Sequence, residues 1–235
     1  MICLKYLTIA LTLSLSYIQP VLSQSDSQRN EFVKAMKFDD VNTVKSLISQ
    51  GINPNLVDSN GNPMLVLAIK DRSYKVIDVL LATKGMDVDL SNKQGETPLM
   101  IASINGDLPL VRTLVLKNKA QLDHISWTPL HYACAKGHLD IAQFLIANGA
   151  KVDSLSLGGT TPLMMAVQSG NELLVKLLLD KGANLQLRNA EAITAIDIAD
   201  IYGKPEISEG LRSRWLKLYK QPYLSTSKLI QPKSP

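Results

Sequence analysis

The side chains most able to do chemistry in this sequence gather in residues 123–138, DHISWTPLHYACAKGH. His124, His131 and His138 are the three histidines of the chain and stand at intervals of seven, and Cys134 is one of two cysteines. Imidazole nitrogens and thiolates are the ligands that zinc prefers, and a thiolate beside an imidazole is a nucleophile with its base. The stretch therefore raises two hypotheses, a metal site and a Cys–His hydrolytic site around His124, His131 and Cys134.

Whether these side chains can meet depends on the repeats that carry them. Five similar phrases follow one another, and the leucine or isoleucine near the start of each recurs at intervals of 34, 31, 33 and 33 residues. The phrases are GNPMLVLAIKDRSYKVIDVLL, GETPLMIASINGDLPLVRTLV, SWTPLHYACAKGHLDIAQFLI, GTTPLMMAVQSGNELLVKLLL and AITAIDIADIYGKPEISEGLR, with the aligned residues Leu65, Leu99, Leu130, Leu163 and Ile196. A period near 33 with a T-P-L-H-x-A motif resembles the ankyrin repeat.

The resemblance implies an all-α ankyrin-repeat solenoid, in which helix-turn-helix units stack and β-hairpin fingers project from one side. About five repeats follow a degenerate N-terminal cap, and the domain covers residues 28–218. The expected units are about 28–57, 58–91, 92–123, 124–155, 156–188 and 189–218. A short linker (24–27) precedes the domain. Residues 219–235 are rich in Lys, Ser and Pro, and we expect them to form a flexible tail.

The first 23 residues have the layout of a cleaved secretory signal. Lys5 is followed by an apolar stretch, Leu7–Ile18, and Val21-Leu22-Ser23 places small residues before the expected cut. The apolar stretch is shorter than the roughly 20 residues that a membrane helix needs, and no later stretch resembles a membrane span. Together with the repeats, the signal suggests similarity to the exported ankyrin-repeat proteins of Gram-negative bacteria. We expect a periplasmic protein or, alternatively, a secreted one.

The repeat pattern places Cys134 in the core. Thr128 and Pro129 are typical of a helix start, and Leu130, Ala133 and Cys134 then share one face of that helix. The equivalent of Cys134 in the other repeats is Ile69, Ser103, Val167 or Asp200. A buried thiol is inert, and the pattern therefore argues against both the metal site and the hydrolytic site.

The repeat pattern also gives two histidines a structural role. His131 occupies the fourth position of T-P-L-H, where the resemblance implies that the ring hydrogen-bonds the backbone of a neighbouring finger. His138 starts the turn between the two helices, which is another family position. His124 lies outside these positions, in the finger that precedes the repeat.

The finger before this repeat is abnormal. From the glycine position that ends one unit to the Thr position that opens the next the count is usually 12, as from Gly149 to Thr161, but from Lys119 to Thr128 it is 9. One interpretation is a tolerated deletion, with Trp127 folded onto the next repeat. The other is a notch in the row of fingers, lined by Trp127, His124, Leu155 and Leu157, where an aromatic side chain could anchor a partner.

The resemblance implies a non-enzymatic module that binds a protein through its concave face of fingers and first helices, without cofactor or metal. A net charge of +4 with no clustered basic face gives no sign of a nucleic-acid partner, and we expect a monomer. A secreted effector or inhibitor that acts on a host or competitor protein is the alternative. The expected contact residues are Asn60, Asn62, Lys93, Gln94, Glu96, Ile104, Asn105, His124, Trp127, Lys136, Leu155, Leu157, Gln168, Glu191 and Tyr202, with Lys70 beside them.

Overall fold

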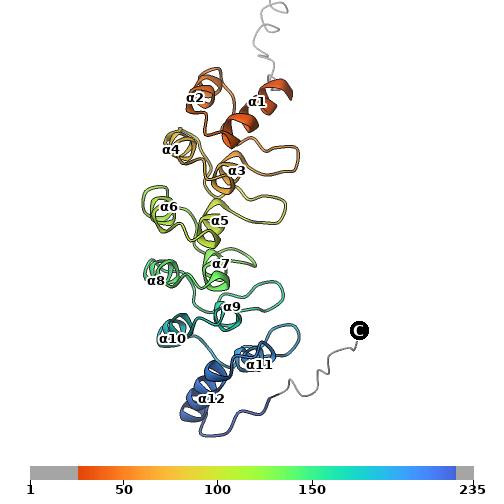
Figure 1. Ribbon diagram of the computed structural model, residues 1–235, viewed down its shortest axis with the longest axis vertical. Helices are drawn as coiled ribbons and strands as arrows, with labels where there is room; N and C mark the ends of the chain where they lie inside the picture. Colours follow the sequence, from red (N-terminus) through yellow and green to blue (C-terminus); the bar gives the residue numbers. More distant parts are fainter. Residues whose placement is uncertain (1–25, 226–235) are drawn as a thin grey trace, which may run out of the picture.

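The chain folds into one elongated stack of helix pairs (Figure 1). The computed structural model describes residues 26–225, so the expected signal segment lies outside the described residues. Within residues 26–225, no helix combines the length and apolarity that a membrane crossing requires. In chain order the elements are α1 (Asp26–Lys37), α2 (Val41–Ser49), α3 (Met64–Lys70), α4 (Tyr74–Ala82), α5 (Pro98–Ile104), α6 (Leu108–Arg112), the π-helical turn η1 (Thr113–Lys117), α7 (Pro129–Lys136), α8 (Leu139–Ala147), α9 (Pro162–Ser169), α10 (Glu172–Asp180), α11 (Ala195–Ile201) and α12 (Pro205–Tyr219).

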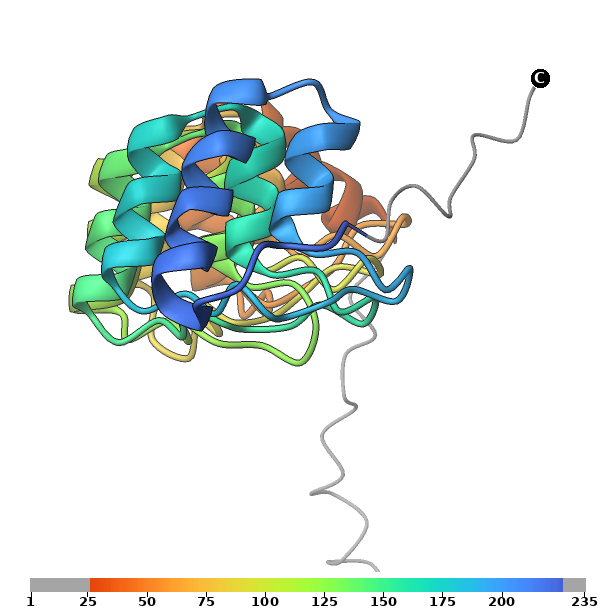
Figure 2. The ribbon, with the colours of Figure 1, turned by 90° about the horizontal axis from the view of Figure 1, so that it is seen from below.

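The helices form two columns, with the fingers projecting from one of them. The first helix of each pair, from α1 to α11, belongs to the inner column, and α2, α4, α6, α8 and α10 form the outer column (Figure 1). Seen along the stack, the fingers lie together on one side of the helices (Figure 2). The prediction of an all-α repeat solenoid is confirmed.

The fingers are closed turns and contain no extended strand in the described part of the chain, where the single β-bridge joins Val57 to Pro63. In each of two fingers one backbone hydrogen bond closes the turn, from Asn92 N to Glu96 O at 3.0 Å and from Ser156 N to Thr160 O at 3.0 Å. The expected β-hairpins are thus reduced to tight hairpin-like loops. Short closed loops hold their tip residues in fixed positions.

Each inner helix starts and ends where its sequence predicts. The Thr161 hydroxyl accepts a hydrogen bond from the N–H of Met164 at 3.2 Å, and Pro162 occupies the first helical position. Gly170 ends the same helix at φ 77°, a left-handed conformation that glycine adopts without steric cost. These local signals recur, so the inner helices have nearly equal lengths and can stack in register.

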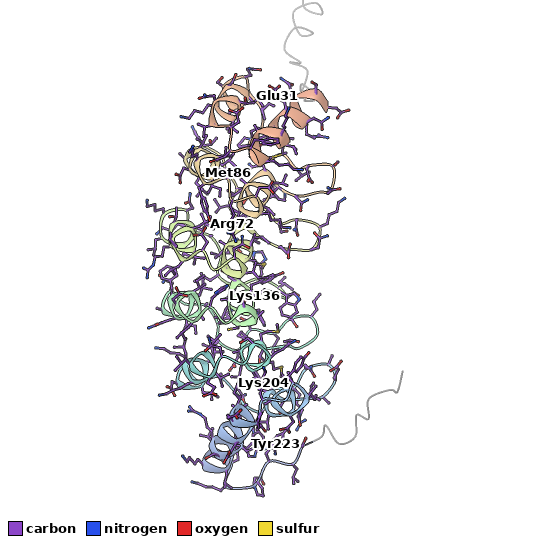
Figure 3. The ribbon with its side chains drawn as sticks, viewed as in Figure 1. Glu31, Arg72, Met86, Lys136, Lys204 and Tyr223 are labelled. Carbon is purple, nitrogen blue, oxygen red and sulfur yellow. The ribbon has the colours of Figure 1, made fainter. Side chains whose placement is uncertain are left out.

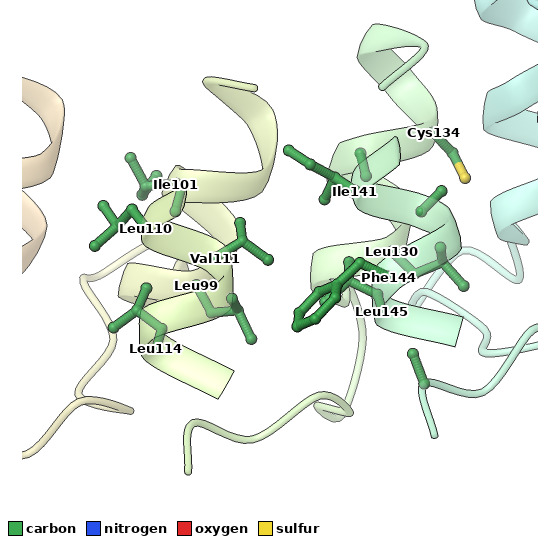
Figure 4. Close-up of a cluster of buried hydrophobic side chains, with 14 of the residues drawn as sticks. Leu99, Ile101, Leu110, Val111, Leu114, Leu130, Cys134, Ile141, Phe144 and Leu145 are labelled. Atoms are coloured by element: carbon green, nitrogen blue, oxygen red, sulfur yellow. The ribbon is translucent and has the colours of Figure 1, made fainter. Parts of the chain in front are cut away.

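The core runs through the whole stack between the two columns. In its centre Leu99 and Leu114 from one repeat lie near Leu130 and Leu145 from the next, and all four are fully buried (Figure 4). No single pair could bury these faces alone, so each repeat depends on its neighbours.

Polar side chains join successive repeats at two further places. At the base of the fingers, the Asp89, Asp123 and Asp153 carboxylates each accept a hydrogen bond from a backbone N–H of the following unit, at 2.9, 3.2 and 3.0 Å. At the turn between the helices, His138 Nε2 lies 3.1 Å from the Ile104 carbonyl of the preceding unit. The structural role predicted for His138 is therefore confirmed.

The unit that precedes the short finger also has an irregular second helix. From the residue before that helix to the glycine position there are 12 steps, Asp107 to Lys119, against 11 from His138 to Gly149. The extra residue is absorbed as the π-helical turn η1, in which Asn118 N bonds to Thr113 O at 3.2 Å. One residue gained and three lost explain the interval of 31 between Leu99 and Leu130.

The chain after α12 packs against the last repeat. Residues 220–225, here called the C-terminal strap, turn back beside α12 and α11, and Tyr223 is 8% exposed (Figure 3). Its hydroxyl donates a hydrogen bond to Asp197, and the Ser225 hydroxyl donates to the same carboxylate at 2.7 Å. The structure thus differs from the expected flexible tail over residues 220–225, because a buried carboxylate holds them. The remainder of that tail lies outside the described residues.

Candidate partner-binding groove

His131 is an internal tie between repeats. Its ring is fully buried, with Nε2 3.0 Å from the Thr160 carbonyl and Nδ1 2.9 Å from the Thr128 hydroxyl. Because a carbonyl only accepts, Nε2 carries the proton and Nδ1 accepts. Burial lowers the pKa of His131, which keeps the ring neutral. The predicted bond to the backbone of the neighbouring finger is confirmed.

Cys134 lies in the core of the stack. Its side chain is fully buried, and this burial raises the pKa of the thiol far above its usual range. Within residues 26–225, no group of three His, Cys, Asp or Glu side chains lies close enough to hold a metal ion. The cysteine and histidine that looked reactive in the sequence are thus a core residue and a backbone tie.

Thiol chemistry can test the burial of Cys134. In a Cys3→Ser chain, where Cys134 is the sole thiol, we expect less than about a tenth of the thiol to react with an aromatic disulfide reagent in native buffer, because only the exposed thiolate attacks. Full reaction should follow in denaturant. The release of the coloured thiolate measures both. Rapid stoichiometric reaction of the native chain would contradict the buried position.

Several of the predicted contact residues in the N-terminal half are engaged within the molecule. Glu96 accepts hydrogen bonds from Lys70 at 3.2 Å, from Asn92 at 2.8 Å and from the Tyr132 hydroxyl at 3.4 Å. Burial raises the pKa of Glu96, but these hydrogen bonds outweigh it and the net pKa is lowered. Burial first, and then the Glu96 charge, raise the pKa of Tyr132 to about 12. This network therefore braces three repeats on the finger side.

The neighbouring finger residues are also tied internally. The Asn62 side chain donates to Asp58 at 3.1 Å, and the Asn105 side chain reaches the Ile69 carbonyl at 3.5 Å. The Lys93 chain lies so close over Gly61 that a Cβ there would stand 2.6 Å from Lys93 Cε. For Asn60 and Gln94, the hydrogen bonds that fix the fingertips come from their backbone N–H groups. Their side chains therefore remain candidates for contact.

The structure brings four of the predicted residues together in the C-terminal half. Trp127, Gln168, Glu191 and Tyr202 line one groove of about 310 Å³ between the fingers and the inner helices. We call it the C-terminal groove. Its complete lining is Trp127, Thr160, Met164, Met165, Gln168, Asn189, Glu191, Ile193, Ile198, Ile201 and Tyr202.

The Trp127 ring is held in place by two other rings. It meets His131 edge-on, with the ring centroids 5.2 Å apart and the planes at 79°, and Tyr132 at 6.4 Å and 74°. Such T-shaped contacts are favourable for aromatic pairs. Trp127 nevertheless remains 37% exposed. The ring is thus packed onto its own repeat and still presents a rigid apolar surface to the groove.

The remaining predicted residues lie outside this groove. Leu157 is 86% exposed at a fingertip, beside the 95% exposed Ile125 of the short finger, and a hydrogen bond of 3.4 Å from Leu157 N to Ser126 Oγ joins the two fingers. Leu155 is exposed on the same finger as Leu157, and Lys136 is exposed at the end of α7 (Figure 3). His124 is partly buried, and its Nε2 has no hydrogen-bond partner among the described residues. The predicted notch thus opens from Trp127 towards α11 instead of towards His124.

Sequence reasoning missed two apolar residues of the groove, Met165 and Ile201. Ile201 follows the aligned isoleucine by five positions, and the same column of the repeats holds Lys70, Ile104 and Gln168. Extending that column to the last repeat would have identified Ile201. Met165 could not be recognised in this way, because its column carries apolar side chains in most repeats and looks like core.

Comparison with known proteins supports the repeat architecture. A family model described as "Ankyrin repeats (3 copies)" matches residues 32–126 and 105–189. The putative ankyrin repeat protein YahD of Escherichia coli is 29% identical over 191 residues, which cover 76% of this chain and 92% of that protein.

Two larger proteins match over a similar region. The human transient receptor potential cation channel subfamily A member 1 is 28% identical over 161 residues, 64% of this chain and 14% of the channel. The chicken nuclear factor NF-kappa-B p105 subunit is 30% identical over 160 residues, 66% of this chain and 16% of that subunit. The chain thus spans well under two thirds of these two relatives. The family model, the recurring TPL phrases and the stacked helix pairs agree, and the chain belongs to the ankyrin-repeat family.

Proposed function

We propose that this chain is an exported, non-enzymatic module that binds another protein through the C-terminal groove and the apolar fingertips beside it. The observation that carries the proposal is the convergence of Trp127, Gln168, Glu191 and Tyr202 on one groove. These side chains come from four different elements of the sequence and have no counterpart in the repeat framework. Framework positions are buried or tied to backbone, whereas these positions face solvent.

Rigid display would supply the binding energy. The groove walls belong to helices and closed turns that are already ordered, so little conformational entropy is lost when a partner docks. Trp127 and Tyr202 are aromatic side chains at the edge of a depression, which is where the few residues that dominate binding energy are usually found. No chemistry on the partner is required.

Export is the second part of the proposal, and it rests on the sequence of residues 1–23 alone. A Lys5-bearing start, a short apolar stretch and small residues before Ser23 support a cleaved signal. We therefore propose the periplasm as the site of action, with secretion as the alternative destination. Cell fractionation of the full chain, with the N-terminus of the recovered protein sequenced, tests export; a cytoplasmic protein that retains residues 1–23 would overturn it.

Capture of partners from an extract of the native compartment tests the binding surface. We expect Tyr202→Ala and Trp127→Ala each to reduce the amount of captured partner at least about 30-fold, as for residues that anchor an interface. Tyr74→Ala is the matched control, because Tyr74 is 50% exposed, as Tyr202 is, but lies at the start of α4 on the outer column.

Each variant is first compared with the parent by thermal unfolding, and Trp127→Leu provides a second variant if Trp127→Ala unfolds more readily. Undiminished capture by both groove variants, or an equal loss with Tyr74→Ala, would show that the proposed surface is incorrect.

A further inference from the structure

The chemistry of the C-terminal groove limits what it can take. Its floor is apolar and largely buried, with Met164, Ile193 and Ile198 beneath the opening and Met165 beside them. Methionine side chains are flexible and adapt their shape to an inserted group. The floor therefore accepts apolar side chains without demanding one exact shape.

The two walls of the groove are apolar and aromatic. On one side stands Trp127, and on the other Ile201 and Tyr202 at the end of α11, where they are 53% and 50% exposed. A volume of about 310 Å³ is at the lower end of the range for ligand sites. The groove is thus large enough for one or two side chains and too small for a folded surface to enter.

The groove contains one charged group, the carboxylate of Glu191. The other polar lining residues, Thr160, Gln168 and Asn189, are neutral. Glu191 is exposed, its backbone N–H bonds to Asn189 at 3.0 Å, and none of the ion pairs in the described part of the chain includes its carboxylate. The net charge that a bound segment meets is therefore negative.

We propose that the groove binds a peptide segment of a partner in which an apolar or aromatic side chain is followed closely by arginine or lysine. The apolar side chain enters between Trp127 and Tyr202, and the basic group pairs with Glu191. Arginine is favoured over lysine, because a guanidinium pairs with a carboxylate through two hydrogen bonds and also stacks on aromatic faces. This inference rests on the proposed function and adds the class of segment that is recognised.

Selection from a random library of displayed 12-residue peptides on the immobilised full chain tests the inference. We expect the selected peptides to combine an apolar or aromatic residue with a nearby arginine or lysine. Measured with synthetic copies of these peptides, Trp127→Ala should weaken binding at least about 30-fold. Glu191→Gln should weaken it about two- to fivefold at low salt, the range for an exposed ion pair, and should remove the preference for basic residues.

Charge reversal and a distant control make the test specific. Glu191→Lys should shift the selection towards acidic peptides, whereas Glu31→Gln, an exposed carboxylate removed at the opposite end of the stack (Figure 3), should leave peptide binding unchanged. Peptides that need Trp127 but show no basic preference and no loss with Glu191→Gln would overturn this inference and leave the proposed function standing. Peptides and partners that bind equally well without Trp127 would overturn both.

Discussion

A Tyr223→Ala chain should lose about 3 to 5 kcal/mol of unfolding free energy, the range for removing a large buried aromatic side chain. Tyr223 is almost fully buried in the C-terminal strap. Its ring packs against Trp215, with centroids 4.9 Å apart in a T-shaped contact, and lies under the Arg212 guanidinium at 5.3 Å. The substitution removes these contacts and a hydrogen bond to Asp197 together.

The Asp197 carboxylate explains why the hydroxyl matters as well as the ring. Asp197 is fully buried and accepts hydrogen bonds from Thr194 N at 2.9 Å, from Ser225 Oγ at 2.7 Å and from the Tyr223 hydroxyl. Burial raises the pKa of Asp197, but these hydrogen bonds outweigh it, and the carboxyl group stays ionised. A buried charge that loses a donor is costly.

Urea unfolding of three variants separates the two contributions. Tyr223→Phe keeps the ring and should cost about 1.5 to 3 kcal/mol, the range for a hydrogen bond to a charged group. Leu224→Ala changes the neighbouring residue, which is 81% exposed, and should alter stability by less than about 0.5 kcal/mol. If Tyr223→Ala were as stable as Leu224→Ala, the strap would not be part of the folded unit.

The second large effect is expected for His131→Met, a change that the protein itself offers. Met100 and Met164 occupy the same position in the two adjacent repeats, where each methionine sulfur accepts from the preceding Thr N–H, at 3.4 and 3.5 Å. The variant therefore keeps the start of α7 and loses the bond from His131 to the Thr160 carbonyl. We expect a loss of about 1 to 3 kcal/mol at pH 7.5.

The pH dependence of this loss identifies the cause. The pKa of His131 is lowered in the folded state, mainly by burial. Its unfolded pKa is about 6.5, so below that pH the unfolded chain binds a proton that the folded chain does not. Stability conferred by the neutral ring is thus complete above pH 6.5 and declines as the pH falls towards the folded pKa.

Urea unfolding at pH 7.5, 6.5 and 5.5 measures this. The parent should lose stability between pH 6.5 and 5.5, and His131→Met should lose less, so the two should converge. His124 and His138 are present in both proteins and cancel in the comparison. Parallel declines in the two proteins would mean that His131 is not held neutral.

The two predictions concern the same position of the repeat. His131 and Asp197 are equivalent residues, and each joins its repeat to the segment that packs against its C-terminal side. His131 donates to the carbonyl of the next finger, whereas Asp197 accepts from the hydroxyl groups of the C-terminal strap. The strap therefore does for the last repeat what a neighbouring finger does for the others.

The sequence by itself determined the repeat architecture of this protein, and with it the roles of His131, His138 and Cys134. Helix starts, helix ends and apolar faces are local patterns, and their repetition five times left one way to stack them. Comparison of aligned positions then separated framework residues from variable ones. The abnormal finger was also visible as a count, although its π-helical turn was not, because an extra residue can be absorbed in a loop or in a helix.

Only the tertiary structure decided which variable residues share a surface. Trp127 and Tyr202 are 75 residues apart, from 127 to 202, and the exact rotation between repeats determines whether their side chains meet. The sequence pointed from Trp127 to His124, Leu155 and Leu157, whereas the groove opens towards Glu191 and Tyr202. The strap was equally hidden, because Tyr223 has no counterpart in the repeat. Its position is set by a long-range contact with one buried carboxylate, and periodicity carries no information about such a contact.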